Sequence, residues 1–307
     1  MDIALMLEGQ HGLTWPRWQR IAAAAEDLGF AGLYRSDHFT NAEPPDMDSL
    51  DLWPSLVWLA SHTRRIEFGP LVTPVSFRHP VFTARFGRDV DDLSGGRLVL
   101  GVGAGWQERE HDHFGFDLLD VPERFARFEE GLEVITRLLH SDEPVDFHGD
   151  YYTLREAILL PRPQRRGGPP VLIGGNGPRR TLPLAVRYAD EWNGVFISAE
   201  KYGALNWQLS EMLDARGRAR ESVRRSVMLG ARPARTLAEA EERLAARGRT
   251  LDDARADGIL ACPLEMYAER LREYEVAGAQ RVMLQWIDLD DIAGLEVLAK
   301  EVLPKFG

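Results

Sequence analysis

The sequence has little cysteine and no long apolar run, and each absence excludes a class of protein. Cys262 is the single cysteine, so neither a disulfide framework nor a metal site built from several cysteines is available. No apolar run approaches the roughly 20 residues of a membrane helix. The amino-terminal residues 1–7 enter a strand-like run without the basic and apolar segments of a secretion signal. We therefore expect a soluble cytoplasmic protein that does not contact a membrane.

Positive charge is also scarce. Lys and Arg number 37 against 48 Asp and Glu, a formal net charge of -11, which disfavours nonspecific binding to nucleic acid. An anionic ligand would need a local basic cluster. The candidates are Arg162, Arg165 and Arg166, then Arg179 and Arg180. The first three are equally compatible with a solvated surface loop. We expect a small-molecule partner rather than a nucleic acid.

What the chain does contain is a regular alternation of short apolar runs and helical patterns. Between the first two runs, apolar residues from Trp15 to Leu28 recur at helical spacing. Alternation of this kind predicts α/β architecture with a parallel sheet, and eight units favour closure into a (β/α)8 TIM barrel. The predicted strands lie near 3–7, 32–35, 66–72, 98–101, 171–173, 192–197, 226–229 and 281–285.

One domain is predicted for residues 1–307, because barrels of this type routinely exceed about 250 residues as one unit. The alternation breaks around 143–170, where Pro, Gly and aromatic residues gather and Tyr151 to Leu154 suggest a small hairpin. We interpret this segment as an insertion. A charged helical excursion at 238–257 forms a second one. We expect the segments 42–50, 107–117 and 145–170 to shape a pocket at the carboxyl ends of the strands.

Asp37 and His38 follow the second predicted strand, at the end of a parallel strand where barrel sites are built. Their side chains diverge, so we expect separate roles. Imidazole titrates near neutrality and suits proton transfer, while the carboxylate suits a ligand hydroxyl. The alternative is that the pair simply caps the next turn.

A glycine-rich segment from Gly174 to Arg179 joins the fifth strand to a helix. Unhindered backbone N–H groups and the positive end of a helix dipole predict a phosphate site there. A tight turn without a ligand is the alternative. After the fourth strand, glycines between Gly101 and Gly105 permit close approach of a planar ligand, and Trp106 would wall the pocket; a flexible loop is the alternative.

Other chemistries find little support. His111 and His113 are two residues apart on a segment that we interpret as a polar loop, and no third His or Cys stands at metal-binding spacing. We predict no metal. No strand end carries a Ser-His-Asp signature or a nucleophile elbow.

Together, these motifs resemble the luciferase-like monooxygenase superfamily, in its branch of oxidoreductases that depend on the deazaflavin coenzyme F420. The resemblance covers almost the whole chain. It is carried by the segments 33–39, 69–80, 101–108, 170–177 and 188–193.

The resemblance implies a luciferase-like barrel, commonly a homodimer, that binds a flavin-type ring at its carboxyl-end face. His38 would lie near the reactive ring edge, and a non-prolyl cis peptide would lie at Pro70-Leu71 or the next bond. The coenzyme contacts that it implies are Asp37, Leu71, Val72, Thr73, Gly103, Gly105, Trp106, Glu108, Gly174, Gly175, Asn176, Gly177 and Arg179.

The sequence also departs from this branch. Its sugar-phosphate dehydrogenases have a glutamate where this chain has Ala104, and a tryptophan where it reads Asn41-Ala42-Glu43. The substrate is therefore not expected to be a sugar phosphate.

Three functions are compatible with the resemblance. The leading hypothesis is hydride transfer between F420 and a small organic substrate, with His38 as proton donor or acceptor. An FMN-dependent monooxygenase is the alternative, and a non-catalytic flavin-binding protein is a third reading. Arginines near 162–166 favour a coenzyme with a long anionic tail, and hence F420.

Overall fold

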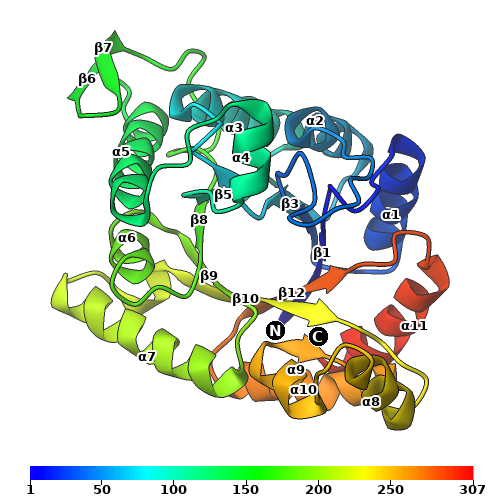
Figure 1. Ribbon diagram of the computed structural model, residues 1–307. Coiled ribbons are helices and arrows are strands. Elements are labelled where there is room, and N and C mark those ends of the chain that lie inside the picture. The colour runs from blue at the N-terminus through cyan, green and yellow to red at the C-terminus, as the bar shows by residue number, and fades with distance from the viewer. Residues whose placement is uncertain (307) are drawn as a thin grey trace.

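The computed structural model describes residues 1–306, and its main sheet is a parallel barrel (Figure 1). Each strand pairs in parallel with the next in the order β3-β2-β1-β12-β10-β9-β8-β5-β4. β3 and β4 are two pieces of the third barrel strand, and a parallel bridge between Phe68 and Leu98 joins it to the fourth. The predicted eight-strand TIM barrel is confirmed. Its strands are β1 (Asp2–Leu7), β2 (Gly32–Arg35), β3 (Glu67–Pro70), β4 (Thr73–Pro74), β5 (Leu100–Gly103), β8 (Val171–Gly174), β9 (Glu191–Val195), β10 (Arg224–Ala231) and β12 (Arg281–Trp286).

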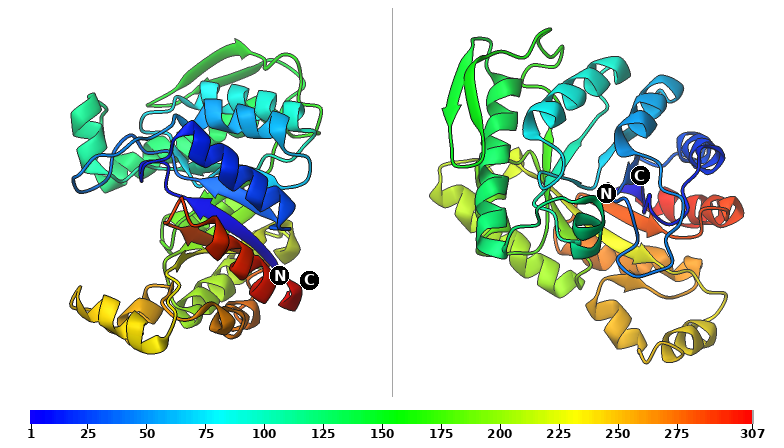
Figure 2. Two further views of the ribbon diagram at one scale, coloured as in Figure 1. Left: turned by 90° about the vertical axis from the view of Figure 1, so that its right-hand side faces the viewer. Right: turned by 45° about the horizontal axis from the view of Figure 1, so that its top comes forward.

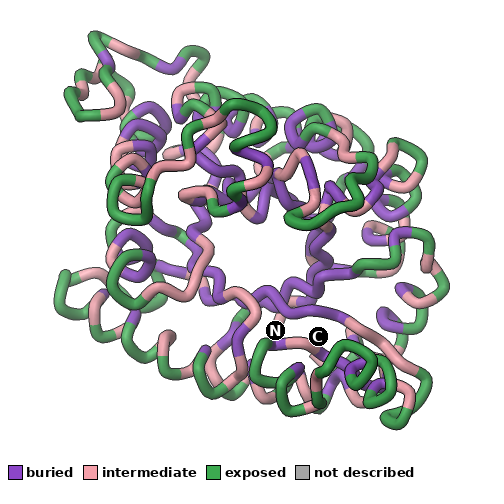
Figure 3. Tube along the Cα trace, viewed as in Figure 1, coloured by how far each residue is buried: buried purple, intermediate pink, exposed green. Residues whose placement is uncertain are grey.

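Helices surround the barrel because each presents an apolar stripe to the strands. In α1, Trp18, Ile21, Ala22 and Ala25 are buried, and Figure 3 shows the same inward burial around the ring. No helix within residues 1–306 has both the length and the apolarity to cross a bilayer. The helices are α1 (Trp15–Asp27), α2 (Leu52–His62), α3 (Pro80–Ser94), α4 (Glu108–Phe114), α5 (Val121–His140), α6 (Thr181–Tyr188), α7 (Ala199–Ala215), α8 (Leu237–Ala245), α9 (Leu251–Ala256), α10 (Tyr267–Val276) and α11 (Ile292–Val302).

The amino end of the barrel is closed by a buried ionic cluster. Arg281 opens β12, is 1% exposed, and donates to the Tyr34 hydroxyl at 2.6 Å and to Glu191 at 3.1 Å. It also pairs with Glu67. Above this layer, apolar side chains such as Met6 fill the barrel interior. These two layers close the amino end and the middle of the barrel, so open space for a ligand remains only at the carboxyl end.

The insertion forms the predicted hairpin, in which β6 (Val145–His148) pairs antiparallel with β7 (Thr153–Ala157). Figure 2 shows this hairpin outside the barrel, next to α5. In the second excursion, the short strand β11 (Ile259–Leu260) adds to the edge of β10, which the sequence did not predict.

The interpretation of the segment around His111 and His113 as a polar loop was wrong, because both residues lie in the helix α4, which spans most of 107–117. Glu108 and Glu110 lie in the first turn, where carboxylates offset the helix dipole. Gly115 ends the helix with φ +72, in the left-handed region that glycine adopts without strain.

Candidate active site

A cavity of about 610 Å³ lies at the carboxyl end of the barrel. That volume is in the usual range for small-molecule and cofactor sites. Its lining is largely apolar with a few polar groups from strand ends. The predicted site residues that line it are Asp37, His38, Leu71, Val72, Gly103, Gly105, Trp106, Gly174 and Gly175.

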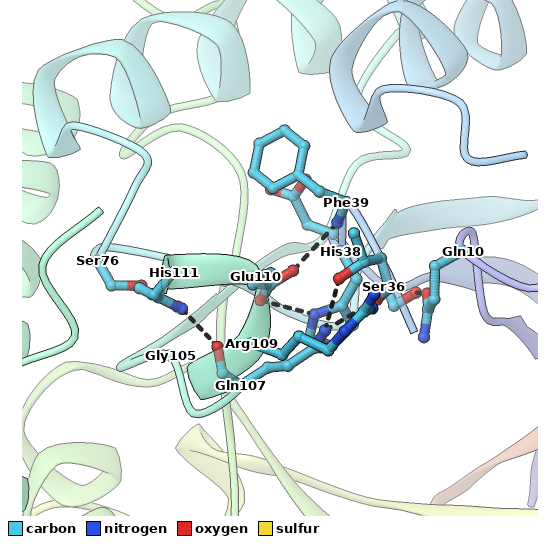
Figure 4. Close-up of polar contacts among 12 residues, drawn as sticks. Gln10, Ser36, His38, Phe39, Ser76, Gly105, Gln107, Arg109, Glu110 and His111 are labelled. Atoms are coloured by element: carbon cyan, nitrogen blue, oxygen red, sulfur yellow. Dashed lines mark hydrogen bonds and ion pairs between the residues drawn. The ribbon is translucent and has the colours of Figure 1, made fainter. Parts of the chain in front are cut away.

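His38 is held at the cavity by Glu110, a residue that the sequence reasoning missed. His38 Nδ1 lies 2.9 Å from Glu110 Oε1, and Glu110 Oε2 accepts the backbone N–H of Phe39 at 3.1 Å (Figure 4). The side chain of Glu110 is 1% exposed and that of His38 is 15% exposed. Because Glu110 occupies Nδ1, Nε2 is the ring nitrogen available to a ligand in the cavity.

The position of Glu110 follows from how α4 is attached to the segment after β2. The amide of Gln107, just before α4, donates to the backbone carbonyl and the hydroxyl of Thr40 at 2.9 and 3.1 Å. Arg109 pairs with Asp46 at 2.6 Å. These contacts turn the buried face of the helix, which carries Glu110, toward His38.

The pKa of His38 is raised above its usual value. Burial alone would lower the pKa, since it disfavours the imidazolium ion. The hydrogen bond and negative charge of Glu110 outweigh the effect of burial and raise the pKa. The negative charges of Glu8 and Asp37 raise it as well. His38 is therefore charged over more of the neutral pH range than an ordinary histidine.

Asp37 is engaged by protein partners on both carboxylate oxygens. Thr73 donates to Oδ2 at 2.8 Å, and Arg78 donates to Oδ2 at 3.1 Å and to Oδ1 at 2.9 Å. Arg78 also contacts Asp51 at 2.7 Å. Thr73, predicted as a coenzyme contact, is fully buried behind the cavity wall. Asp37 and Thr73 therefore form part of the structure that supports the neighbouring His38.

A chain of hydrogen bonds fixes further polar side chains in the cavity lining. Gln285 at the end of β12 donates to Glu8 Oε1 at 2.6 Å, and Gln10 donates to Glu8 Oε2 at 3.0 Å. Ser36 donates to Gln10 at 2.8 Å and accepts from the backbone N–H of Gly9. Glu8, Gln10 and Ser36 all line the cavity.

Glycine is required where the third and fourth strands approach each other. A Cβ on Gly103 would lie 2.4 Å from Val72 Cγ2, and one on Gly105, which has φ +88, would lie 2.3 Å from Ser76 Oγ. The peptide bond Leu71-Val72 is cis. The resemblance placed such a bond at Pro70-Leu71 or at the next bond, and it is the next one.

The glycine-rich loop after β8 lies at the cavity rim. Gly174, Gly175 and Thr181, the first residue of α6, line the cavity. Asn176 instead exchanges two hydrogen bonds with the backbone of Val195, at 2.6 and 2.8 Å. Gly177 accepts the N–H groups of residues 181 and 182. Arg179 is exposed on the turn, so the loop is anchored on its barrel side and open on its outer side.

Five of the predicted coenzyme contacts do not line the cavity: Thr73, Glu108, Asn176, Gly177 and Arg179. Glu108 is exposed on α4 and does not line the cavity; Glu110, two residues on, does. The helical turn separates the two carboxylates, which a loop interpretation could not reveal.

The arginines of the insertion lie away from the cavity. Arg165 pairs with Asp91 at 3.0 Å and with the carbonyl of Gly96, and Arg162 pairs with Asp142 at 3.0 Å. Their loop leads into the amino end of β8, opposite the cavity. The argument that these arginines favour a coenzyme with an anionic tail was therefore wrong.

The insertion and the 42–50 segment do not line the cavity either. Residues of α5 take that place, together with residues at the end of β9 and in the middle of β10. Their sequence signal was the apolar pattern of 121–139, which predicted a helix without showing which side chains reach the cavity. The lining residues that the sequence reasoning missed include Glu110, Val121, Arg124, Phe125, Phe128, Thr181, Val195, Phe196 and Met228.

The histidine pair on α4 is not arranged for metal binding. His111 Nε2 lies 2.8 Å from Ser76 Oγ and its Nδ1 lies 2.7 Å from the Gln107 carbonyl, so both ring nitrogens are engaged. Across residues 1–306, no group of three or more His, Cys, Asp or Glu side chains is placed to hold a metal ion.

The barrel and its largely apolar cavity, with glycines and a few polar groups from strand ends in its lining, define a small-molecule enzyme of the (β/α)8 class. A family model described as luciferase-like monooxygenase matches residues 3–297, and the chain belongs to this family of flavin- or F420-dependent oxidoreductases.

Individual relatives fall into more than one functional group. The chain is 32% identical over 187 residues to a 4-hydroxyprotoasukamycin monooxygenase of Streptomyces nodosus subsp. asukaensis, covering 61% of this chain and 48% of the relative. It is 33% identical over 186 residues to an F420-dependent glucose-6-phosphate dehydrogenase of Amycolatopsis mediterranei, covering 59% and 53%. The chain thus matches about half the length of these curated relatives.

Among solved structures, an F420-dependent secondary alcohol dehydrogenase in complex with an F420-acetone adduct superposes with a TM-score of 0.87. The superposition covers 99% of this chain and 98% of that one at 20% sequence identity. At this identity the likeness shows a shared fold.

Proposed function

We propose that the protein is an F420-dependent oxidoreductase that transfers a hydride between the coenzyme and a small organic substrate. The observation that carries the proposal is the His38–Glu110 pair on the cavity wall, with 2.9 Å between His38 Nδ1 and Glu110 Oε1. A hydride transfer to or from a carbonyl carbon needs a proton donor or acceptor at the oxygen, and a positioned histidine is the commonest group for that task.

Glu110 and His38 would have different roles, Glu110 in positioning and His38 in proton transfer. Glu110 fixes the ring orientation and leaves Nε2 facing the cavity side, and its charge raises the pKa of His38 against the effect of burial. The protonated ring would donate to an oxygen that gains electron density, and the neutral ring would accept the proton in the reverse direction. When bound, the deazaflavin would supply or accept the hydride, while the protein supplies position and electrostatics.

The cavity fits a planar coenzyme with a phosphate. Gly103 adds no side chain to the surface beside Leu71-Val72, and Gly175 with the start of α6 offers an anion site at the rim. Asn193, buried in the middle of β9 in the cavity wall, has no partner for its Oδ1 within residues 1–306. Such an acceptor would pair with a donor on the ring.

The second candidate is an FMN-dependent monooxygenase. Its specific support is the apolar side of the cavity, where Phe125, Phe128 and Phe196 would keep water from a reactive flavin. The similarity to a curated monooxygenase points in the same direction.

Separate titrations of the purified apo-protein with F420 and with FMN distinguish the two candidates. Trp106 lines the cavity with its ring centroid 5.6 Å from that of His38, so quenching of its fluorescence reports occupancy. The variant Trp106→Phe identifies the part of the fluorescence quenching that comes from Trp106. We expect micromolar or tighter binding of F420 and much weaker binding of FMN. Preference for FMN would favour monooxygenation, and binding of neither would refute the coenzyme assignment.

A further inference from the structure

A second cavity, of about 590 Å³, lies outside the barrel interior between α8 and the loop that joins β12 to α11. Figure 1 shows these elements on one side of the molecule. Arginine side chains dominate its polar lining. The residues that matter for its chemistry are Arg232, Arg243, Arg247, Trp286, Asp288 and Asp291.

Arg232 is a partly buried cation whose protein partners are all uncharged. Its guanidinium donates to the carbonyls of Ala231 and Gln285 at 2.8 and 3.3 Å, and to the side-chain oxygen of Gln285 at 2.6 Å. Within residues 1–306, none of its hydrogen-bond partners is a carboxylate. A desolvated charge without a counter-charge is costly, so an anion in the cavity would be stabilised.

A second cation reinforces this one. Burial, together with the positive charge of nearby Arg247, lowers the pKa of Arg232 to about 10, although Tyr267 and Glu8 partly offset both effects. In the part of the chain that the structure describes, the guanidinium of Arg247 has no hydrogen-bond acceptor. Arg243 is neutralised by Glu239 at 2.6 Å. Two guanidinium groups of like charge therefore remain for an anion to bridge.

The carboxylates in the lining are committed elsewhere. Asp291 caps α11 by accepting the N–H of Gly294 at 2.8 Å, and Asp288 accepts the N–H of Asp290 at 3.1 Å. Neither carboxylate is among the hydrogen-bond partners of Arg232.

Trp286 supplies an independent sign of a missing acceptor. Its side chain is 2% exposed and lines the cavity, and its indole N–H has no partner within residues 1–306. A buried indole N–H normally has an acceptor, and leaving it unpaired costs free energy.

We propose that this cavity is a binding site for a small oxyanion, a phosphate or carboxylate group, held by Arg232 and Arg247 with the Trp286 indole as a further donor. The site is separate from the central cavity, and the Gln285 amide joins the two, since it accepts from Arg232 and donates to Glu8. The proposal does not depend on the identity of the coenzyme.

The test is a titration of the full-length protein with inorganic phosphate, and separately with acetate, at constant ionic strength and without coenzyme. The indole N–H resonance of Trp286 in ¹⁵N-labelled protein, assigned with Trp286→Phe, reports binding at the site. We expect this resonance to move saturably, and the midpoint concentration to rise roughly tenfold or more in Arg232→Gln, as for loss of a charge-assisted hydrogen bond.

Arg247→Gln should also raise the midpoint concentration. This variant tests the proposal if Arg232→Gln does not fold. Arg235→Gln is the matched control, because it removes the same charge from a side chain that is 89% exposed and paired with Glu239. It should leave the midpoint unchanged.

Movement with phosphate alone would identify phosphoryl compounds as the ligand class, and movement with acetate as well would extend it to carboxylates. Absence of a saturable shift, or equal midpoints in the wild type and both Arg232→Gln and Arg247→Gln, would overturn the proposal.

Discussion

Glu110→Gln is the substitution that tests the centre of the site most directly. The carboxylate receives His38 Nδ1 at 2.9 Å and the Phe39 N–H at 3.1 Å, and an amide keeps only one oxygen for these two donors. When His38 is charged, the variant loses a charge-assisted hydrogen bond, which contributes about 1.5–3 kcal/mol. When His38 is neutral, it loses an ordinary one, about 1 kcal/mol.

The pH dependence follows from the direction of the His38 pKa shift. Because the folded-state pKa is raised above the ordinary histidine value of about 6.5, the stabilisation is fully present below about pH 6.5 and is lost as the pH rises through the folded-state pKa. A chain of 307 residues has an unfolding entropy of about 0.6 kcal/mol/K. We therefore expect Tm to fall by roughly 3–5 °C at acidic pH and by about 2 °C at alkaline pH.

Thermal unfolding of the wild type and the variant between about pH 5.5 and about pH 9 measures this difference in Tm. Glu108→Gln is the matched control, since it makes the same chemical change on the exposed face of the same helix. It should give a small difference without this pH dependence. A Tm difference between the wild type and Glu110→Gln that stays constant or grows toward alkaline pH would refute the role assigned to the His38–Glu110 pair.

Three further predictions concern catalysis, coenzyme binding and assembly. His38→Ala should lower turnover by roughly 10²–10⁴ and change coenzyme affinity by less than about tenfold; unchanged turnover would remove His38 from the mechanism. Arg179→Ala should weaken coenzyme binding more at low salt than at high salt, because an exposed charge contact is screened; equal losses would indicate a packing role. We also expect a homodimer that buries the exposed stacked pair Phe82 and Phe86, which are 58% and 40% exposed. Phe82→Lys should then give a monomer in light scattering, and a monomeric wild type would contradict this.

Local patterns were sufficient to predict most elements. The hairpin of the insertion, the α5 helix and the strand that ends at Arg35 all appear where spacing and turn residues placed them. The α4 helix was missed because its seven residues are mostly charged and carry no apolar stripe. A short polar helix of this kind is stabilised by its caps and its contacts, which spacing does not report.

The sequence by itself determined the alternation of strands and helices, and through it the end of the barrel at which His38, Gly103 and Gly175 meet. Chain direction is enough for that inference, because parallel strands bring their carboxyl ends to one face. Only the tertiary structure decided which side chains act there. Glu110 rather than Glu108 contacts His38, and Arg165 lies at the opposite end, because side-chain direction and helix rotation depend on packing between segments far apart in the chain.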